Sequence, residues 1–368
     1  MEQKICRLIL KDGAEFVGTH FGADKDAIVE LVFNTSMVGY QEILSDPSYT
    51  DQAVVMTYPL IGNYGINDDD FETKRPSMSG FVVRDYNDEP SNFRSSMTLQ
   101  EVMIKYGIVG ISGVDTRKIA RHIREYGSSL AIITGSDISV EEAVRRLNEY
   151  EAPRDAVSRV STKQKYEAEY PTTGEYHVVA IDCGMKENIV RMMCEKGMRV
   201  TVVPWDTTSE DILALKPDGV FISNGPGDPT DVSKTIETIK KLIGKCPIFG
   251  ICLGHQIISL AYGARTYKLK FGHRGGNHPV KNLLTDKIEI TSQNHSYAVD
   301  VDSVKNTDLE ITHMNLLDNT VEGVRCTKDY VSSVQYHPES APGPQDSAYL
   351  FDEFIGMMKD WKEDKENA

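Results

Sequence analysis

The sequence lacks the features that mark secreted, membrane-spanning and zinc-binding proteins. Its six cysteines are scattered without a C-x-x-C or any other metal-ligand spacing, which disfavours disulfides and predicts no metal site. No uninterrupted apolar run approaches the roughly 20 residues that a membrane helix needs, and the first residues contain no apolar signal core. We therefore predict a cytoplasmic protein that does not contact a membrane.

Positive charge and phosphate-binding loops are also scarce. The chain has 40 basic against 55 acidic residues, a net charge of -15, which argues against a general nucleic-acid binder. There is no G-x-x-x-x-G-K-[ST] segment, and the loop at residues 225–227 lacks the G-x-G-x-x-G continuation. If the reaction uses ATP, we expect ATP to bind to another chain.

The chain of 368 residues is too long for one typical core, so we predict two domains. Residues 1–150 mix strand and helix patterns and form an N-terminal mixed α/β domain. Residues 151–176 lose periodicity and are predicted to connect the domains. Residues 177–361 alternate strands and helices, which favours an α/β fold with a mostly parallel sheet flanked by helices, and residues 362–368 form a charged tail.

Particular residues support these elements. Strands are predicted at residues 5–10, 15–19, 28–33, 53–58 and 81–84 in the first half, and at 266–271, 278–283, 288–291 and 310–314 late in the second. Capping boxes begin helices at Thr98 and Ser139. A further helix over 115–127 carries Arg117, Arg121 and Arg124 on one face, which is either solvated or a partner surface.

A candidate nucleophile lies at Cys252. Residues 246–263 contain a short apolar run, then Gly-x-Cys-x-Gly, then apolar residues at helical spacing, which predicts a strand, a sharp turn and a helix. We expect the glycines on either side to permit unusual backbone angles, and the helix N-terminus to help hold a thiolate or an oxyanion. The alternative is a buried structural cysteine.

A base and an orienting acid follow at the end of another predicted strand. His337 and Glu339 are two residues apart, so on a strand they project to the same face. The glycine loop at 225–227 ends a third strand, and the carboxyl ends of parallel strands share one crevice. A cysteine, a histidine and a glutamate together favour nucleophilic catalysis, although a lone histidine is often structural.

The remaining histidines give weaker indications. His273 and His278 lie in a glycine-rich segment without a nearby acidic cluster in the sequence, which indicates a tight loop rather than a metal site. His255 is predicted to stabilise the start of the helix that follows Cys252.

Residues 250–256 (GICLGHQ), 223–229 (SNGPGDP) and 337–339 (HPE) resemble the class I, or triad, glutamine amidotransferases. Further motifs resemble the family of small, glutamine-hydrolysing subunits of carbamoyl-phosphate synthase. These are residues 34–49 (NTSMVGYQEILSDPSY), 115–118 (DTRK), 271–279 (FGHRGGNHP) and 340–346 (SAPGPQD). The resemblance implies a flavodoxin-like, class I amidotransferase fold in the second domain and partner contact through the first.

The resemblance implies hydrolysis of L-glutamine through a Cys252 thioester, with His337 as acid and base and Glu339 orienting it. The ammonia passes to a large subunit, which uses two ATP, with magnesium, and bicarbonate to make carbamoyl phosphate for pyrimidine or arginine synthesis, so this chain needs no cofactor of its own. Backbone amides of Leu253 and Gly225 form the oxyanion hole. The implied glutamine-binding residues are Ser48, Gly225, Gly227, Leu253, Gln256, Asn294, Ser296 and Tyr297.

The segment 294–297 departs from the family pattern, in which the last two positions are Gly-Phe rather than Ser296 and Tyr297. If a positive φ is needed at Ser296, serine would strain the backbone. Two other functions stay open on the residues: a regulatory subunit that binds glutamine without hydrolysing it, and a stand-alone cysteine hydrolase.

Overall fold

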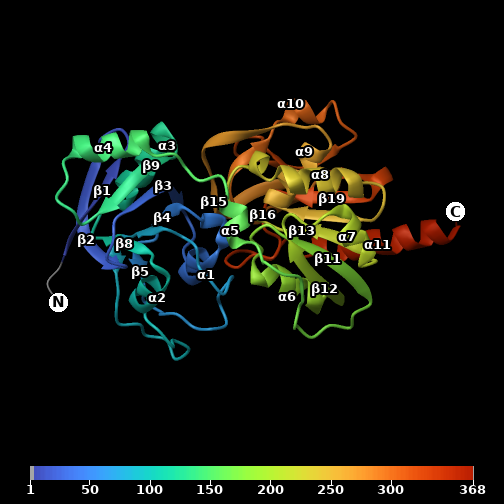
Figure 1. Ribbon diagram of the computed structural model, residues 1–368, viewed down its shortest axis with the longest axis horizontal. Helices are drawn as coiled ribbons and strands as arrows, with labels where there is room; N and C mark the ends of the chain where they lie inside the picture. The colour runs from blue at the N-terminus through green and yellow to red at the C-terminus, as the bar shows by residue number, and fades with distance from the viewer. Residues whose placement is uncertain (1–3, 368) are drawn as a thin grey trace. The chain divides into compact units, whose positions relative to one another are not determined.

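The computed structural model describes residues 4–367 and divides the chain into two compact units, Met1–Pro153 and Arg154–Ala368. The first unit is drawn in blue to green and the second in green to red (Figure 1). Each unit has its own sheet and its own hydrophobic core.

The N-terminal unit is built on a closed barrel with the strand order β1-β2-β8-β6-β4-β3-β9. The pairs β3–β4, β4–β6 and β6–β8 are parallel, and the others are antiparallel. Helix α4 packs Ala143 and Leu147 against Ile9 and Ile132 of the barrel wall. The barrel strands are β1 (Ile5–Leu10), β2 (Glu15–Gly22), β3 (Ala27–Asn34), β4 (Gln52–Met56), β6 (Gly80–Val82), β8 (Val109–Ser112) and β9 (Ser129–Thr134); β5 (Leu60–Ile61) pairs with β7 (Asp85–Tyr86).

The helices of this unit begin close to the predicted positions. Thr98 and Glu101 form the predicted reciprocal capping box of α2, which satisfies two amides that the helix leaves free. Ser139 caps α4, but Glu142 pairs with Arg145 and Arg146 instead of returning to the Ser139 amide. The helices are α1 (Tyr40–Ser45), η1 (Pro47–Tyr49), α2 (Leu99–Tyr106), α3 (Thr116–Tyr126) and α4 (Val140–Glu149).

The C-terminal unit is built on a ten-stranded sheet with the order β10-β12-β11-β13-β14-β19-β18-β16-β15-β17. Five strands, in the order β12-β11-β13-β14-β19, are parallel, and the other five join antiparallel. The sheet is therefore half parallel rather than mostly parallel. The strands are β10 (Tyr166–Glu167), β11 (Tyr176–Asp182), β12 (Met198–Pro204), β13 (Gly219–Ile222), β14 (Ile248–Ile251), β15 (Thr266–Asn282), β16 (Ile288–Val299), β17 (Glu310–Asn315), β18 (Val321–Cys326) and β19 (Val331–Val334).

Helices cover both faces of the parallel strands. Val179 and Ile181 of β11 pack in one apolar cluster with α7, α8 and α9, whereas Val178 and Ala180 pack in another with α6 and α11. Successive residues of a strand point to opposite faces, so one strand supplies both clusters. The helices are α5 (Ala156–Val160), α6 (Glu187–Glu195), α7 (Ser209–Ala214), η2 (Pro229–Asp231), α8 (Ser233–Leu242), α9 (Leu253–Ala261), α10 (Val301–Val304), η3 (Thr327–Asp329) and α11 (Leu350–Asn367).

Three segments are more ordered than the sequence predicts. The predicted connection contains α5 and β10, and β10 pairs with β12. Helix α11 continues through the predicted tail to Asn367. The segments predicted as separate short strands belong to β15 and β16, whose pairing shifts register between Lys268 and His273 and again between Gly275 and His278. Glycines at these irregularities hide the strand in the sequence pattern.

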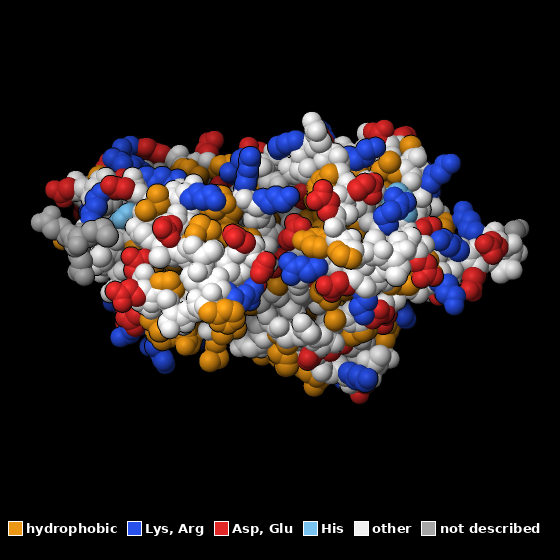
Figure 2. Space-filling view, turned by 90° about the horizontal axis from the view of Figure 1, so that it is seen from below, with side chains coloured by type: hydrophobic (Ala, Val, Ile, Leu, Met, Phe, Trp, Pro, Cys, Tyr) orange, Lys and Arg blue, Asp and Glu red, His pale blue; other side chains and the backbone are white. Residues whose placement is uncertain are grey.

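The exposed surface mixes charges of both signs. Acidic and basic side chains are interspersed on the face shown in Figure 2. Arg117, Arg121 and Arg124 are exposed on α3, so the basic face of this helix exists and its use as a partner surface stays a prediction. None of the described helices combines the length and the apolar character needed to cross a bilayer.

Candidate active site

Cys252 lies at the turn between β14 and α9, as the sequence predicts. Its backbone has φ 55° and ψ -103°, an unfavourable region for a residue other than glycine. The Cys252 amide donates to Val334 O of the neighbouring β19 at 2.9 Å, and the thiol donates to Asn294 O at 3.6 Å. Cys252 is therefore held at the carboxyl end of the parallel strands, its backbone by β19 and its thiol by β16.

The flanking glycines act by their size and not, as predicted, by their backbone angles. Gly250 and Gly254 are not among the residues with positive φ, whereas Cys252 itself is. A Cβ atom on Gly254 would lie 2.2 Å from Ile222 O, and one on Gly250 would lie 2.7 Å from Ile258 Cδ1. Glycine at both positions lets α9 pack directly against β13 and β14, while the nucleophile carries the backbone strain.

His337 and Glu339 meet as predicted, although they lie beyond the end of β19 rather than on it. His337 Nδ1 is 2.6 Å from Glu339 Oε1, and both side chains are buried. His337 Nε2 has no hydrogen-bond partner among the described residues. The Nδ1 contact fixes the ring orientation and leaves Nε2 available for a proton transfer.

Lys186, just before α6, is a site residue that the sequence does not predict. Its Nζ lies 2.9 Å from Glu339 Oε1 and 2.6 Å from Ser340 O, and its side chain is 3% exposed. Asn188 adds a hydrogen bond to Glu339 O at 2.6 Å. In the sequence, Lys186 is only a lysine that follows the strand end at residues 182–184. The amphipathic pattern predicts that it lies at a solvated helix end.

The buried charges at this site support one another. Burial alone would lower the pKa of His337. The charge of Glu339 and the interaction with Cys252 outweigh this effect and raise the pKa to about 10. Burial raises the pKa of Glu339, but Lys186 and His337 lower it to about 2. Glu339 is thus ionised and His337 protonated at neutral pH, a state suited to hold a thiolate.

Several of the residues predicted to bind glutamine in this unit contact Cys252 or the helix that follows it. A Cβ on Gly225 would lie 2.2 Å from Cys183 O and 2.8 Å from Leu253 Cδ2, so the glycine loop packs closely on the start of α9. Gly227 has φ 88°. Gln256 Nε2 donates to Tyr297 O at 2.9 Å, which ties α9 to the segment that contains Asn294.

Ser296 does not show the strain considered above. It lies within β16, and the described residues with positive φ do not include it. Its hydroxyl instead accepts a hydrogen bond from Arg274 Nη2. Ser48 belongs to the other unit, where it is buried in η1 and its amide donates to Asp46 Oδ1 at 2.8 Å. A contact of Ser48 with glutamine therefore stays a prediction.

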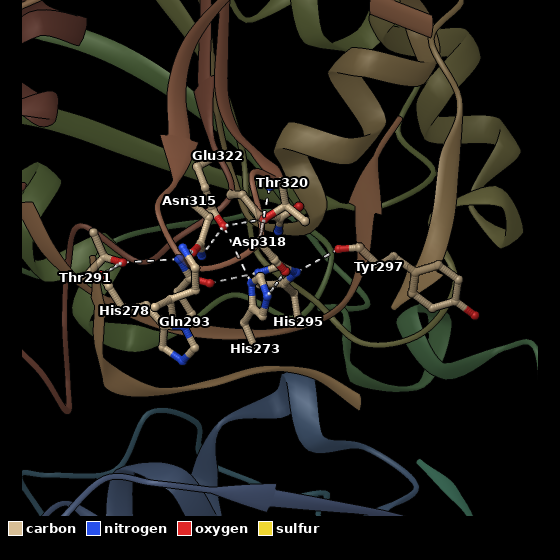
Figure 3. Close-up of polar contacts among 12 residues, drawn as sticks. His273, His278, Thr291, Gln293, His295, Tyr297, Asn315, Asp318, Thr320 and Glu322 are labelled. Atoms are coloured by element: carbon tan, nitrogen blue, oxygen red, sulfur yellow. Dashed lines mark hydrogen bonds and ion pairs between the residues drawn. The ribbon is translucent and has the colours of Figure 1, made fainter. Parts of the chain in front are cut away.

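The predictions for the other histidines have different outcomes. His255 lies in the first turn of α9, fully buried, with Nδ1 3.0 Å from Ser333 Oγ, a contact that links the start of the helix to β19. The prediction for His273 is wrong. His273 does have acidic neighbours, because β18 and the turn before it bring Glu322 and Asp318 to it (Figure 3). These carboxylates lie 45 and more residues away in sequence, beyond the reach of local pattern reasoning.

A thiol on a strand–helix turn, with a histidine–carboxylate pair at the end of the adjacent parallel strand, is the arrangement of a triad amidotransferase. Residues 179–357 match the family described as Glutamine amidotransferase class-I. Residues 8–133 match the family described as Carbamoyl-phosphate synthase small chain, CPSase domain.

Curated relatives extend this similarity over nearly the whole chain. A carbamoyl phosphate synthase small chain of Staphylococcus epidermidis is 55% identical over 356 residues, which cover 97% of this chain and 96% of that protein. Small chains of Fusobacterium nucleatum (54% identical, covering 95% and 97%) and Bacillus caldolyticus (53%, covering 96% and 97%) are similar to the same extent. The chain belongs to the carbamoyl phosphate synthase small chain family.

Proposed function

We propose that this chain is the glutamine-hydrolysing subunit of a carbamoyl phosphate synthase. The proposal rests on one observation. Lys186, Glu339 and His337 form a buried chain of hydrogen bonds next to Cys252, whose backbone has a positive φ. Family membership supports a large subunit as the partner, to which we assign ATP, magnesium and bicarbonate, so that the proposed reaction on this chain needs no cofactor. The strand order of the parallel segment, 2-1-3-4-5 in chain order, supports the description of this unit as flavodoxin-like. A cytoplasmic location stays a prediction.

In the proposed first step, Cys252 Sγ attacks the side-chain amide carbon of glutamine. The carbonyl oxygen becomes an oxyanion, which the backbone N–H groups of Leu253 and Gly225 stabilise. His337 Nε2 gives its proton to the amide nitrogen, the C–N bond breaks, and ammonia leaves a thioester on Cys252.

In the second step, neutral His337 takes a proton from water, and the hydroxide attacks the thioester carbon. The C–S bond breaks, glutamate leaves, and the thiolate–imidazolium pair is restored. Glu339 keeps the ring oriented through both steps and stabilises its positive charge. Gly227, Gln256, Asn294, Ser296 and Tyr297 are proposed to line the glutamine site; the predicted contribution of Ser48 completes the set.

Co-purification with a large subunit tests this proposal. We expect the complex to release glutamate from glutamine and to release it faster when ATP and bicarbonate are present, because the two reactions are coupled. Glutamine binding without glutamate release would favour the regulatory function instead. High activity of the isolated chain on a γ-glutamyl substrate, without stimulation by the large subunit, would favour the stand-alone hydrolase.

The pH dependence of glutamine hydrolysis tests the role of Glu339. In Glu339→Gln the charge that raises the pKa of His337 is lost, and we expect that pKa to fall by about 1–3 units. The imidazolium then loses its proton at lower pH, so the alkaline limb of the kcat/KM profile should move down by at least about one pH unit. Glu353→Gln, on α11, is the matched control and should leave the profile unchanged. An unchanged alkaline limb in Glu339→Gln would contradict the assigned role.

The same pair makes folding stability depend on pH. His337 has a raised pKa, so its contribution is complete below 6.5 and is lost as the pH rises through about 10. Glu339 has a lowered pKa, so its contribution is complete above 4.5 and is lost as the pH falls through about 2. The two contributions are both complete only between about pH 4.5 and 6.5.

A further inference from the structure

A second cluster of buried ionisable side chains lies outside the catalytic triad. His273 on β15, His295 on β16 and Glu322 on β18 face one another (Figure 3). One potential ligand atom from each lies within 4.8 Å of the other two. His273 Nδ1 is 3.6 Å from Glu322 Oε1, and the side chain of Glu322 is completely buried. The mechanism proposed above uses none of these three side chains.

Each of the three side chains is held by a hydrogen bond to a residue outside the cluster. His273 Nε2 is 2.8 Å from Asp318 Oδ2. His295 Nδ1 donates to Tyr297 O at 2.7 Å, and Glu322 Oε1 accepts from Asn315 Nδ2 at 3.0 Å. Histidine ligands of metal ions are held in this way by a carboxylate or a backbone carbonyl, which fixes the ring and its tautomer.

The atoms that face the cluster lack suitable partners. His273 Nδ1 and Glu322 Oε2 are buried without a hydrogen-bond partner among the described residues. His295 Nε2 is 3.1 Å from Gln293 Oε1. Tyr297 O can only accept a hydrogen bond, so a ring proton of His295 is on Nδ1. When the ring carries one proton, the lone pair of Nε2 faces the acceptor oxygen of Gln293, an arrangement that a bound cation would resolve.

A proton is the competing occupant of this space. Burial lowers the pKa of His273, but its hydrogen bond to Asp318 and the nearby carboxylate of Glu322 raise it to about 9. A proton on His273 Nδ1 satisfies that one atom. It leaves the lone pair of His295 Nε2 and the second oxygen of Glu322 without a partner, whereas one metal ion can bind all three residues.

We propose that His273, His295 and Glu322 bind one divalent transition-metal ion of the zinc type. Two imidazoles and a carboxylate with a fourth position for water form a set that zinc accepts. Two ligands on a tetrahedral zinc ion are about 3.3 Å apart for bonds of about 2 Å, close to the 3.6 Å between His273 Nδ1 and Glu322 Oε1. Glu322 and Asp318 balance the two positive charges, against the opposing charge of Arg274 near His295.

The ion has a structural role beside the active site. His295 directly follows Asn294, whose carbonyl accepts the hydrogen bond from the Cys252 thiol. Binding β15, β16 and β18 to one ion fixes the segment 294–297 independently of any substrate. The ion takes no part in the proposed reaction.

Metal titration of the full-length chain tests this inference. The purified protein is stripped with a chelator and titrated with Zn²⁺ by calorimetry, and with Co²⁺ while its visible absorption is recorded. We expect one equivalent to bind with a tetrahedral Co²⁺ spectrum. His273→Gln and Glu322→Gln should weaken binding at least about 100-fold, and Asp318→Asn about 10–100-fold. His278→Gln is the matched control, because this ring is 5.2 Å from that of His273 but belongs to no ligand set, and it should bind normally.

The thiol of Cys252 with His337 is the other pair that zinc could find, so the titration is repeated with Cys252→Ser. Retention of one equivalent in that variant supports the inference, and loss of binding there overturns it. Absence of binding to the wild-type chain also overturns it, whether or not the variants fold, and leaves a protonated His273 between two carboxylates. Unchanged binding in a folded Glu322→Gln chain overturns it as well.

Discussion

Cys252→Ala should abolish glutamine-dependent synthesis of carbamoyl phosphate while ammonia-dependent synthesis by the same complex continues. The alanine side chain cannot form the thioester, and loss of a nucleophile commonly lowers kcat by more than about 10³-fold. Synthesis from ammonia bypasses this chain's chemistry. Both rates are measured on the purified complex, with glutamate release as the direct readout of hydrolysis.

Cys246→Ala is the matched control for this change. Cys246 is a buried thiol just before β14, and burial raises its pKa to about 12, so it is unreactive at neutral pH. We expect both rates to be retained in this variant. If Cys252→Ala lost both rates, Cys252 would be a structural residue; if it lost neither, the assigned nucleophile would be wrong.

Lys186→Met should destabilise the C-terminal unit by about 3–5 kcal/mol, because it leaves the buried carboxylate of Glu339 without its lysine partner. Methionine keeps the length and apolar character of the side chain, so the change tests the charge rather than the packing. The free energy of unfolding is measured on the full chain by urea titration at neutral pH. We also expect glutamine hydrolysis to fall, since Glu339 would orient His337 less firmly.

Lys196→Met gives a close comparison, because Lys186 and Lys196 flank the two ends of α6. Lys196 pairs with Asp352 at 2.7 Å, but both side chains are substantially exposed, and exposed pairs contribute at most about 1 kcal/mol. In the double variant Lys186→Met and Glu339→Gln the two losses should not add, because each alone already breaks the same pair. Two results would contradict this prediction. One is an equal loss of unfolding free energy in Lys186→Met and Lys196→Met. The other is a loss in the double variant that equals the sum of the two single losses, which would show that burial does not strengthen the pair of Lys186 with Glu339.

The parts of the fold that depend on local patterns are predictable from the sequence. Strand β1 begins and ends at the predicted residues, and the capping box of Thr98 forms as predicted, since each depends on residues a few positions apart. The consecutive strands β15 and β16 pair with two shifts of register, and β10 pairs with β12, which lies beyond β11 and α6 in the sequence. The sequence therefore predicts too little strand in both places and too much parallel pairing in the sheet.

The candidate site divides in the same way. Cys252, His337 and Glu339 each end a predicted strand, so the rule that parallel strands end at one edge brings them together. Lys186 and the pair formed by Glu322 with His273 depend on which helix or strand packs across that edge, and nothing in the local sequence indicates this. The sequence also does not predict why glycine is needed on either side of Cys252. The reason is the close packing of α9 on the sheet, which leaves no room for a Cβ atom at either position.

The backbone of Cys252 places activity and stability in opposition at one residue. A conformation with positive φ costs a residue other than glycine about 1–3 kcal/mol, and glycine at this position would avoid the cost but remove the thiol. Selection for stability alone would therefore favour the loss of the nucleophile. A chain of this fold that no longer needs to hydrolyse glutamine has a simple evolutionary route from an enzyme to a more stable binding protein.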